Sequence, residues 1–549
     1  MPQESASSPI SRAAGALVNA DLWTMVTPSS QASAVAWKDG RIVAVGSDDE
    51  VRAAALKAGI PEEAIVDVGG ARVLPGFVDA HMHFLHASVK NLRPDLAHAE
   101  SLEDAFERLR TWLAANPGDG GVIAEALDES RWPEPRLPTM AEVDEAVGTD
   151  RPIVLRRICG HTAVANRVAL PLVRAKWDRD DLVDLATGRL DEEASLYLNE
   201  VLPSSDDELD AAVRDACALA HSLGVTALGD YSQAPYRAAL LRGAASGDLT
   251  VRVASNIYPQ FLDDAVAGAN KPGSAEAADG TDQPFHTGRP RGRDDGAWLQ
   301  DGGLKIFLDG SFGGNTAYLR EEYADDPGNR GKRNWTDEQL DQMMAKAHAA
   351  GIQLHLHVIG DAAIDQGLAA YARLAAAEDL SEGWQHGLRH RFEHYELPHP
   401  EAVALTAELG IVASCQPNFV GEWSTKEGMY GQRLGARVEL NNRYRDFLAA
   451  GVPLAFGSDG MPFGPLRGID AAVHHPVESQ RLTWQEAVFF YTDRAAWSIH
   501  RADLGRIEPG CLADLVIVGD TDERPRSWRV EATISDGDLV HGSLPGASS

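Results

Sequence analysis

The sequence predicts an α/β fold, a (β/α)8 TIM-like barrel, with a small discontinuous β-sandwich formed by the N- and C-terminal segments. Three observations predict it. Strand-like apolar runs alternate with helical segments from about residue 225 onward. An earlier apolar run ends in His81-Met82-His83, and short β-like runs gather at both ends of the chain. With 549 residues the chain is long enough for a large barrel and an accessory domain.

The net charge of the chain indicates which kinds of binding partner to exclude. The chain has 82 acidic and 50 basic residues, a formal net charge of -32. Such acidity argues against nucleic acid or an anionic membrane surface as a partner. No run approaches the roughly 18 apolar residues of a membrane helix, and the first residues lack the pattern of a secretory signal. The four cysteines form no CxxC pair, so neither a disulfide framework nor a zinc knuckle is predicted. We therefore expect a soluble, cytoplasmic protein.

The two ends of the chain share a β-like character. Residues 14–73 contain short apolar runs, and the turn at 38–40 (Lys-Asp-Gly) is a hairpin signal. Similar runs return near the other end, at 513–520, 529–537 and 538–542. We expect residues 14–73 and 499–545 to form one small β domain that flanks a barrel at 74–498.

The barrel is expected to carry a long insertion at about 84–220, which contains a helix starting near Ser101. After the strand that ends at His83, seven more strands are predicted at 225–230, 251–258, 304–310, 353–361, 388–394, 411–417 and 453–459. Capping boxes start two of the helices between and after these strands, one at 336–339 and one at 483–486. The stretch 268–296 is rich in Gly, Pro and Asp and is predicted to be a loop.

Polar residues on five of these strands suggest a metal site. Side chains alternate faces along a strand, so His81 and His83 project the same way and can bind one divalent ion. Catalytic groups of such barrels lie at the C-terminal ends of the strands, which makes convergence on one rim expected. The candidate ligands are His81, His83, Lys305, His357, His394 and Asp459. Imidazole and carboxylate are ligands that suit Zn²⁺ and related ions.

Two histidine assignments stay open at this point. His355 lies two residues before His357 and on the same strand face, so either side chain could be the ligand. His390 and His394 pose the same question. In both pairs we prefer the histidine nearer the end of the strand.

Several motifs together resemble the amidohydrolase superfamily and, within it, the amidohydrolase-3 branch of YtcJ-like metal-dependent hydrolases. The matching segments are PGFVDAHMHF, GLKIFLDGSFGGNTAYL, LHLHVIGDAAID, RHRFEHYELP, QPNF and FGSDGMPFGPL. LDESRWPE and CGHTAVANRVAL are similar to that branch's insertion after the first strand. The resemblance covers about residues 15–545.

The resemblance implies a centre with one or two divalent ions, with zinc preferred. In it, His81 and His83 bind the more buried ion, and His357 and His394 hold the second. Lys305 bridges the two ions as an N-carboxylated lysine, because a neutral amine can add CO₂ to give an anionic carbamate.

The same resemblance assigns the chemistry. Asp459 touches the bridging water and acts as the proton shuttle while a metal-bound hydroxide attacks a carbonyl carbon. If Lys305 is unmodified, Asp309 on the same strand face could replace it as a carboxylate ligand. Four further residues are candidates for contacts with the substrate: Trp132, His161, Asp309 and Asp361.

The leading hypothesis is therefore hydrolysis of a C–N bond in a small amide. The preference for an N-substituted formamide follows from similarity to the N-substituted formamide deformylases of this branch. A deaminase or a cyclic-amide hydrolase is the alternative on the same ligand set, and a non-catalytic barrel scaffold is a remote one. A homodimer is a family-level expectation.

Overall fold

The computed structural model describes residues 10–545 except for residues 12, 130–131, 159–161, 192, 197, 233–234, 268–284, 286, 290–297, 378–386 and 520–527. The chain forms two compact units, one of Met1–Phe84 with Cys217–Ser549 and one of Leu85–Ala216. The predicted loop at 268–296 lies almost wholly outside the described residues, and the candidate His161 lies outside them too. Within the described parts, no helix is long and apolar enough to cross a membrane.

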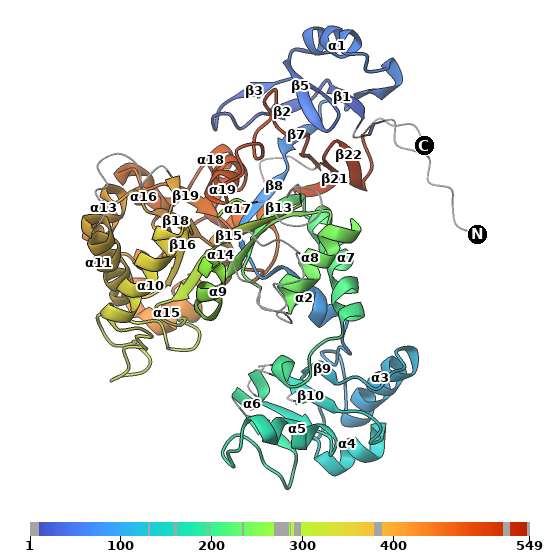
Figure 1. Ribbon diagram of the computed structural model, residues 1–549, viewed down its shortest axis with the longest axis vertical. Coiled ribbons are helices and arrows are strands. Elements are labelled where there is room, and N and C mark those ends of the chain that lie inside the picture. The colour runs from blue at the N-terminus through green and yellow to red at the C-terminus, as the bar shows by residue number, and fades with distance from the viewer. Residues whose placement is uncertain are drawn as a thin grey trace. The chain divides into compact units, whose positions relative to one another are not determined.

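An eight-stranded parallel sheet forms the barrel of the first unit (Figure 1). Its strands are β8 (Phe77–Met82), β13 (Val225–Asp230), β14 (Arg252–Ile257), β15 (Leu299–Phe307), β16 (Leu354–Val358), β17 (Arg391–His394), β18 (Val412–Cys415) and β19 (Leu454–Phe456). Each pairs with the next in chain order, so all eight predicted strands are confirmed. The backbone N–H of Asp459 donates to the carbonyl of His81 at 2.7 Å, which brings the end of β19 beside β8 and nearly closes the barrel.

Strand β15 begins earlier than predicted. Its first residues include Gly302 and Gly303, which read as strand breakers in the sequence. A Cβ on Gly302 would lie 2.2 Å from Oδ1 of Asn256, so close packing against β14 requires glycine here. Lys305 therefore lies in the last third of its strand, near the rim, rather than at the strand's start.

Helices follow most barrel strands. They are α8 (Tyr236–Ser246), α9 (Leu262–Ala267), α10 (Asp337–Ala349), α11 (Asp361–Ala377), α13 (Pro400–Glu408), α14 (Pro417–Trp423), α15 (Met429–Leu434), α16 (Tyr444–Ala450), α17 (Pro465–Val473), α18 (Trp484–Phe490) and α19 (Asp493–Ser498). Both predicted capping boxes form: the hydroxyls of Thr336 and Thr483 accept from the backbone N–H groups of Gln339 and Glu486.

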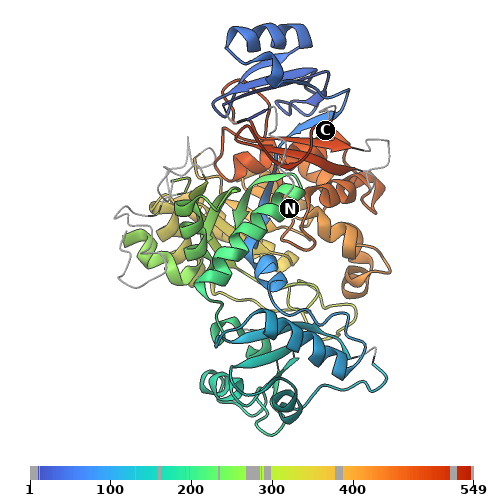
Figure 2. The ribbon, with the colours of Figure 1, turned by 90° about the vertical axis from the view of Figure 1, so that its right-hand side faces the viewer.

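Strands from both ends of the chain build the β-sandwich beside the barrel, as Figure 2 shows in blue and red. One sheet has the order β22-β21-β20-β7-β2-β3 and the other β5-β4-β1-β6. The strands are β1 (Ala14–Val18), β2 (Asp21–Trp23), β3 (Gln31–Ala32), β4 (Ala34–Lys38), β5 (Arg41–Gly46), β6 (Ile65–Asp67), β7 (Arg72–Pro75), β20 (Leu515–Gly519), β21 (Arg529–Ser535) and β22 (Asp538–Gly542). Helix α1 (Asp48–Lys57) follows β5.

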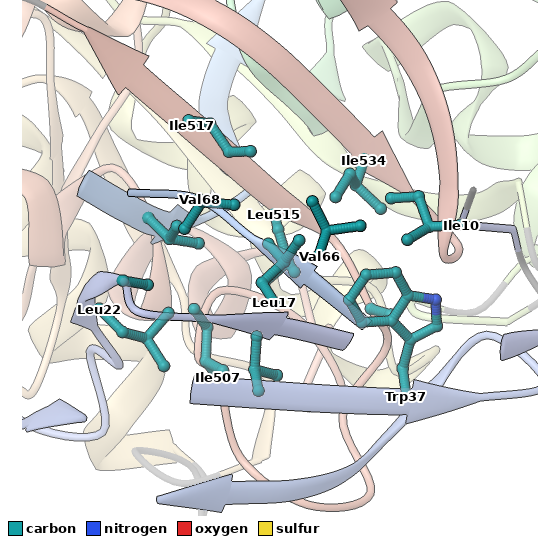
Figure 3. Close-up of a cluster of buried hydrophobic side chains, with 14 of the residues drawn as sticks. Ile10, Leu17, Leu22, Trp37, Val66, Val68, Ile507, Leu515, Ile517 and Ile534 are labelled. Atoms are coloured by element: carbon teal, nitrogen blue, oxygen red, sulfur yellow. The ribbon is translucent and has the colours of Figure 1, made fainter. Parts of the chain in front are cut away.

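One core joins the two sheets (Figure 3). Leu17 and Trp37 from one sheet pack with Ile517 and Ile534 from the other, and all four are fully or almost fully buried. The predicted sandwich is confirmed. Its strand β7 continues into β8 through Gly76 alone, where a Cβ would lie 2.4 Å from Oγ1 of Thr226.

The second unit has its own four-stranded sheet in the order β12-β11-β10-β9. Its elements are α3 (Leu102–Ala115), β9 (Val122–Leu127), α4 (Met140–Val147), β10 (Ile153–Arg157), β11 (Thr162–Ala165), α5 (Ala169–Lys176), β12 (Arg189–Asp191) and α6 (Glu193–Leu196). Ser101 caps α3 as predicted, its hydroxyl accepting from the N–H of Asp104 at 3.2 Å. Helices α2 (Phe84–Asn91) and α7 (Asp206–Ser222) span the points where the chain passes between the units.

Trp132 belongs to the core of this second unit. Its ring packs with the apolar residues of α3 and β9, and its indole N–H donates to the carbonyl of Ala99 at 2.8 Å. Only 5% of the residue is exposed. This burial gives Trp132 a packing role within the unit, and its contact with substrate stays a prediction.

Candidate metal centre

At the C-terminal rim of the barrel, side chains at or just after the ends of β8, β15 and β19 come together. Nζ of Lys305 lies 3.3 Å from Nε2 of His81. Oδ1 of Asp459 lies 3.3 Å from Nε2 of His83 and 3.7 Å from Nε2 of His81. His81 and Lys305 are completely buried, whereas His83 keeps a third of its side chain exposed. The centre is therefore closed below and open toward the mouth of the barrel.

Strands β16 and β17 add His357 and His394 to the same cluster. The ring of His394 lies 4.3 Å from that of His357 and 4.8 Å from that of His81, between ring centroids. One nitrogen or oxygen atom each of His81, His394 and Asp459 lies within 4.8 Å of the others, a spacing that could hold one metal ion. All six predicted ligand positions thus lie in one place.

The two alternative histidines make other contacts. Nδ1 of His355 faces the hydroxyl of Tyr231 at 2.7 Å. His390 accepts from the N–H of Leu354 through Nδ1 at 2.9 Å, and its Nε2 lies 2.8 Å from Nδ1 of His348. His390 therefore binds the entry of β16, at the end of the strand opposite the cluster.

Left-handed backbone conformations aim two of the candidate ligands. His394 has φ of 73° and Asp459 has φ of 57°, values that are uncommon for residues other than glycine. In a regular strand the side chains of Glu393 and His394 would point to opposite faces. The positive φ at the end of β17 lets both side chains reach His81.

Burial sets the protonation states at the centre. It lowers the pKa of His81 and His394 well below the ordinary histidine value and that of His357 to about 3. These rings are therefore neutral, and each has one ring nitrogen with a free lone pair. Burial also lowers the pKa of Lys305 to about 8. The same burial raises the pKa of Asp459 to about 7, although the nearby Lys305 opposes this rise.

Sequence reasoning missed Glu393, which holds His81 in place. Oε2 of Glu393 lies 2.5 Å from Nδ1 of His81. Its other oxygen accepts from the hydroxyl of Tyr231 at 2.9 Å and from Nε of Arg391. A carboxylate on Nδ1 fixes the ring tautomer and leaves Nε2 as the lone-pair donor toward the centre. Burial alone would raise the pKa of Glu393, but Arg391, His355 and Lys305 outweigh it and lower the pKa to about 2.

Arg391 lies beneath this contact and is fully buried. Its guanidinium donates to the carbonyl of Ala80 at 2.7 Å, to the Tyr231 hydroxyl at 2.9 Å and to Oγ of Ser414 at 3.1 Å. Tyr231 stacks on His81, with ring centroids 4.0 Å apart. The sequence signal for this network is two opposite charges two residues apart in a strand, since such charges are buried only when paired.

The two remaining aspartates hold loops at the mouth. The carboxylate of Asp309 accepts from the backbone N–H groups of Ile359, Gly360 and Tyr318, at 3.1, 2.8 and 2.9 Å. Burial raises its pKa to about 7. Asp309 also lies 3.6 Å from Nε2 of His357. Asp361 begins α11 and accepts from the backbone N–H of Arg320 at 2.8 Å, a bond that ties the loop around Arg320 to the start of this helix.

The donor set fits a divalent ion. Among the described residues, Nδ1 of His357, Nδ1 of His394 and Oδ1 of Asp459 are buried atoms without a hydrogen-bond partner. Buried polar atoms are ordinarily satisfied, so their convergence needs an explanation. Neutral imidazoles with a carboxylate are the ligand types that Zn²⁺ takes in proteins.

A family profile and several known proteins match this chain over nearly its whole length. The sequence profile of the amidohydrolase family (Amidohydro_3) matches residues 64–541. The chain is 27% identical to the Bacillus subtilis protein YtcJ, over 95% of this chain and 98% of that protein. It is 26% identical to an N-substituted formamide deformylase of Arthrobacter pascens, over 91% of this chain and 92% of the deformylase.

A solved structure is similar to this chain over nearly its whole length. The crystal structure of an uncharacterized metal-dependent hydrolase of Pyrococcus furiosus superposes with a TM-score of 0.77 at 25% identity, covering 92% of this chain and 98% of that one. The profile match spans most of the sequence and includes every strand of the barrel. The chain belongs to the amidohydrolase family.

Proposed function

We propose that the protein is a metal-dependent amidohydrolase that cleaves the C–N bond of a small amide, with N-substituted formamides as the preferred class. The observation that carries the proposal is the convergence of unpartnered imidazole nitrogens and a carboxylate oxygen at the open rim of the barrel. The proposed ligands are His81, His83, Lys305, His357, His394 and Asp459. The formamide preference is supported by the similarity to the Arthrobacter pascens deformylase.

A divalent ion held by these residues supplies a coordinated water of lowered pKa and a Lewis acid for the carbonyl oxygen. Side chains around these ligands hold them in the orientation that metal binding requires. Glu393 keeps the Nδ1 proton of His81 and so presents Nε2 to the centre. Tyr231 stacks on the same ring and limits its rotation.

Lys305 is proposed to act in its carboxylated form. The neutral amine adds CO₂ and releases one proton, which converts a donor group into an anionic oxygen ligand. Its burial and its lowered pKa support the neutral amine that this step needs. Asp309 is a poorer bridging candidate, because three backbone N–H groups already occupy its carboxylate.

Asp459 is proposed as the proton shuttle. It accepts a proton from the attacking water and gives it to the leaving nitrogen as the C–N bond breaks. Oδ1 has no hydrogen-bond partner among the described residues and lies beside His81 and His83, where that water would lie. Burial raises the pKa of this carboxyl to about 7, a value suited to both accepting and donating near neutral pH.

The first experiment is elemental analysis of protein purified without chelator. Two divalent ions per chain support the bridged centre, one ion reduces Lys305 to a structural role, and no ion even after reconstitution with zinc refutes the proposal. Metal-loaded protein is then assayed on formamides, open-chain amides, cyclic amides and amino-substituted heterocycles, with separate detection of formate, amine and ammonia. Ammonia release from a ring amine, without amide cleavage, favours the deaminase alternative.

The variant Asp459→Asn keeps the shape of the side chain and removes the proton acceptor. We expect kcat to fall by about 10²–10⁴. An unchanged kcat would remove Asp459 from the mechanism.

A further inference from the structure

A hollow of about 610 Å³ opens at the barrel rim beside the candidate metal centre. It lies at the ends of β14 and β15 and at the loop before α10. Its lining residues are Tyr258, Pro259, Gln260, Phe307, Asn334 and Trp335. Its volume is within the range of small-molecule sites in proteins.

Phe307 is the wall between the hollow and the centre. It is the last residue of β15 and shares a strand face with Lys305, two residues earlier. Nζ of Lys305 lies 5.0 Å from the centroid of the Phe307 ring, and the ring of His357 lies 4.8 Å from it. A substrate whose carbonyl lies at the centre can therefore reach the hollow across the width of a single ring.

Three of the polar side chains that line the hollow donate hydrogen bonds within the protein. The indole N–H of Trp335 donates to the carbonyl of Phe307 at 2.8 Å, and the Tyr258 hydroxyl donates to the carbonyl of Tyr231 at 2.5 Å. The side-chain amide of Asn334 donates to the carbonyls of Phe307 and Asp309, both at 3.2 Å. These bonds also fix the rings, so they present carbon surface rather than donors.

The rings are arranged for a flat group. The Tyr258 and Phe307 rings are almost parallel, with an interplanar angle of 12° and centroids 6.1 Å apart. Their separation is too small to admit a third ring between them, so a ligand ring packs over them and against Trp335. Pre-oriented aromatic surfaces favour aromatic ligands through area burial and through offset or edge-to-face contacts.

We propose that this hollow is a subsite for an aryl group of the substrate, so that the protein prefers aryl-bearing amides over small alkyl amides. The inference rests on the proposed function and adds the substrate class. The aryl group can belong to the amine side or to the acyl side of the scissile bond, and Phe307, Tyr258 and Trp335 form the recognition surface in either case.

The test compares kcat/KM for matched substrates in zinc-loaded protein. One arm uses N-benzylformamide against N-methylformamide, and the other uses N-methyl-phenylacetamide against N-methylacetamide. We expect the aryl substrate to be preferred in at least one arm, which identifies the side of the bond. Trp335→Ala and Phe307→Leu are each expected to lower the aryl-to-methyl ratio by about 10- to 100-fold.

Trp484→Ala is the matched control. This tryptophan is also half-buried and also adjoins a capping threonine, but its ring contacts His474 and Trp528, away from the hollow. The ratio should stay at the wild-type value. An aryl preference that survives both Trp335→Ala and Phe307→Leu, or amide hydrolysis without any aryl preference, overturns the inference and leaves the proposed function standing.

A binding measurement separates the two proposals. Metal-free protein is titrated with N-(4-fluorobenzyl)formamide, and the ligand ¹⁹F line width is followed by NMR. Broadening in wild-type protein and in Trp484→Ala, but not in Trp335→Ala, supports the hollow even if the loaded protein hydrolyses none of the amides, a result that would refute the proposed function alone. Equal broadening in Trp335→Ala refutes the subsite.

Discussion

Replacing Glu393 by glutamine tests how the metal centre is held. The change keeps the shape of the side chain, removes the charge that faces Arg391, and offers His81 an amide in place of a carboxylate. An amide N–H₂ toward Nδ1 would favour the tautomer whose Nε2 carries the proton, and this tautomer cannot bind a metal through Nε2, the atom that faces the centre. Loss of a carboxylate on a metal-binding histidine typically weakens metal affinity by about 10- to 100-fold, or about 1.4 to 2.7 kcal/mol.

Stability should fall as well. Arg391 is fully buried, and among the described residues its guanidinium forms an ion pair with the carboxylate of Glu393. Removal of one partner from a buried pair costs about 3–5 kcal/mol. The double variant Glu393→Gln with Arg391→Met removes both charges and should recover much of this stability, but it should not recover metal affinity.

The assay is a competition titration of zinc against a chromogenic chelator, with urea unfolding of the metal-free protein in parallel. Glu486→Gln is the matched control, because Glu486 pairs with Arg445 on a half-exposed helix start. We expect the control to bind zinc as the wild type does. A zinc Kd within about twofold of wild type in folded Glu393→Gln would refute the role of Glu393 in orienting His81.

Three further outcomes are expected. Lys305→Ala should lose at least one ion by elemental analysis and most activity, with partial rescue by small carboxylates plus metal; unchanged metal content would contradict the bridging role. Burial lowers the pKa of His221 and of His475 to about 4, against about 6.5 in the unfolded chain, so the unfolded state binds more protons between these pH values. The melting temperature should therefore fall as pH drops from about 6.5 to 4, and His475→Gln should flatten that profile; an identical profile would contradict the assignment. Trp37→Ala should destabilise the sandwich by about 3–5 kcal/mol in urea unfolding, because the Trp37 side chain is completely buried between the sheets.

The barrel was predictable because most of its strands are short apolar runs that have a polar residue at or within three positions of their end. The first and last residues of the strands were harder to predict. In β15 the pair Gly302-Gly303 reads as a break, and only the contact with Asn256 shows why glycine is needed inside the strand. The four-stranded sheet of the second unit was missed, because its apolar runs carry no period that separates buried strands from buried helices.

At the candidate centre, the candidate ligands could be predicted from the sequence. The backbone conformations and neighbouring side chains that orient them could not. A histidine before a turn predicts a ligand, whereas the φ of 73° that turns His394 inward leaves no trace in the sequence. Glu393 and Arg391 look like an exposed charge pair until tertiary packing buries both. The bond from the backbone N–H of Arg320 to Asp361 is also a tertiary contact that the sequence does not show, and the contact of Asp361 with substrate stays a prediction.

The pairing of β7 with β20 has a consequence for biosynthesis. β7 lies inside its sheet, between β2 and β20, yet β20 belongs to the opposite end of the chain. While the ribosome is still at work, Val73 and Leu74 have an open edge that awaits a late-arriving neighbour. Because Gly76 alone separates β7 from β8, the N-terminal end of the strand that carries His81 gains this support only when β20 arrives. We expect newly made chains to bind metal only after β20 has been synthesised and has paired with β7.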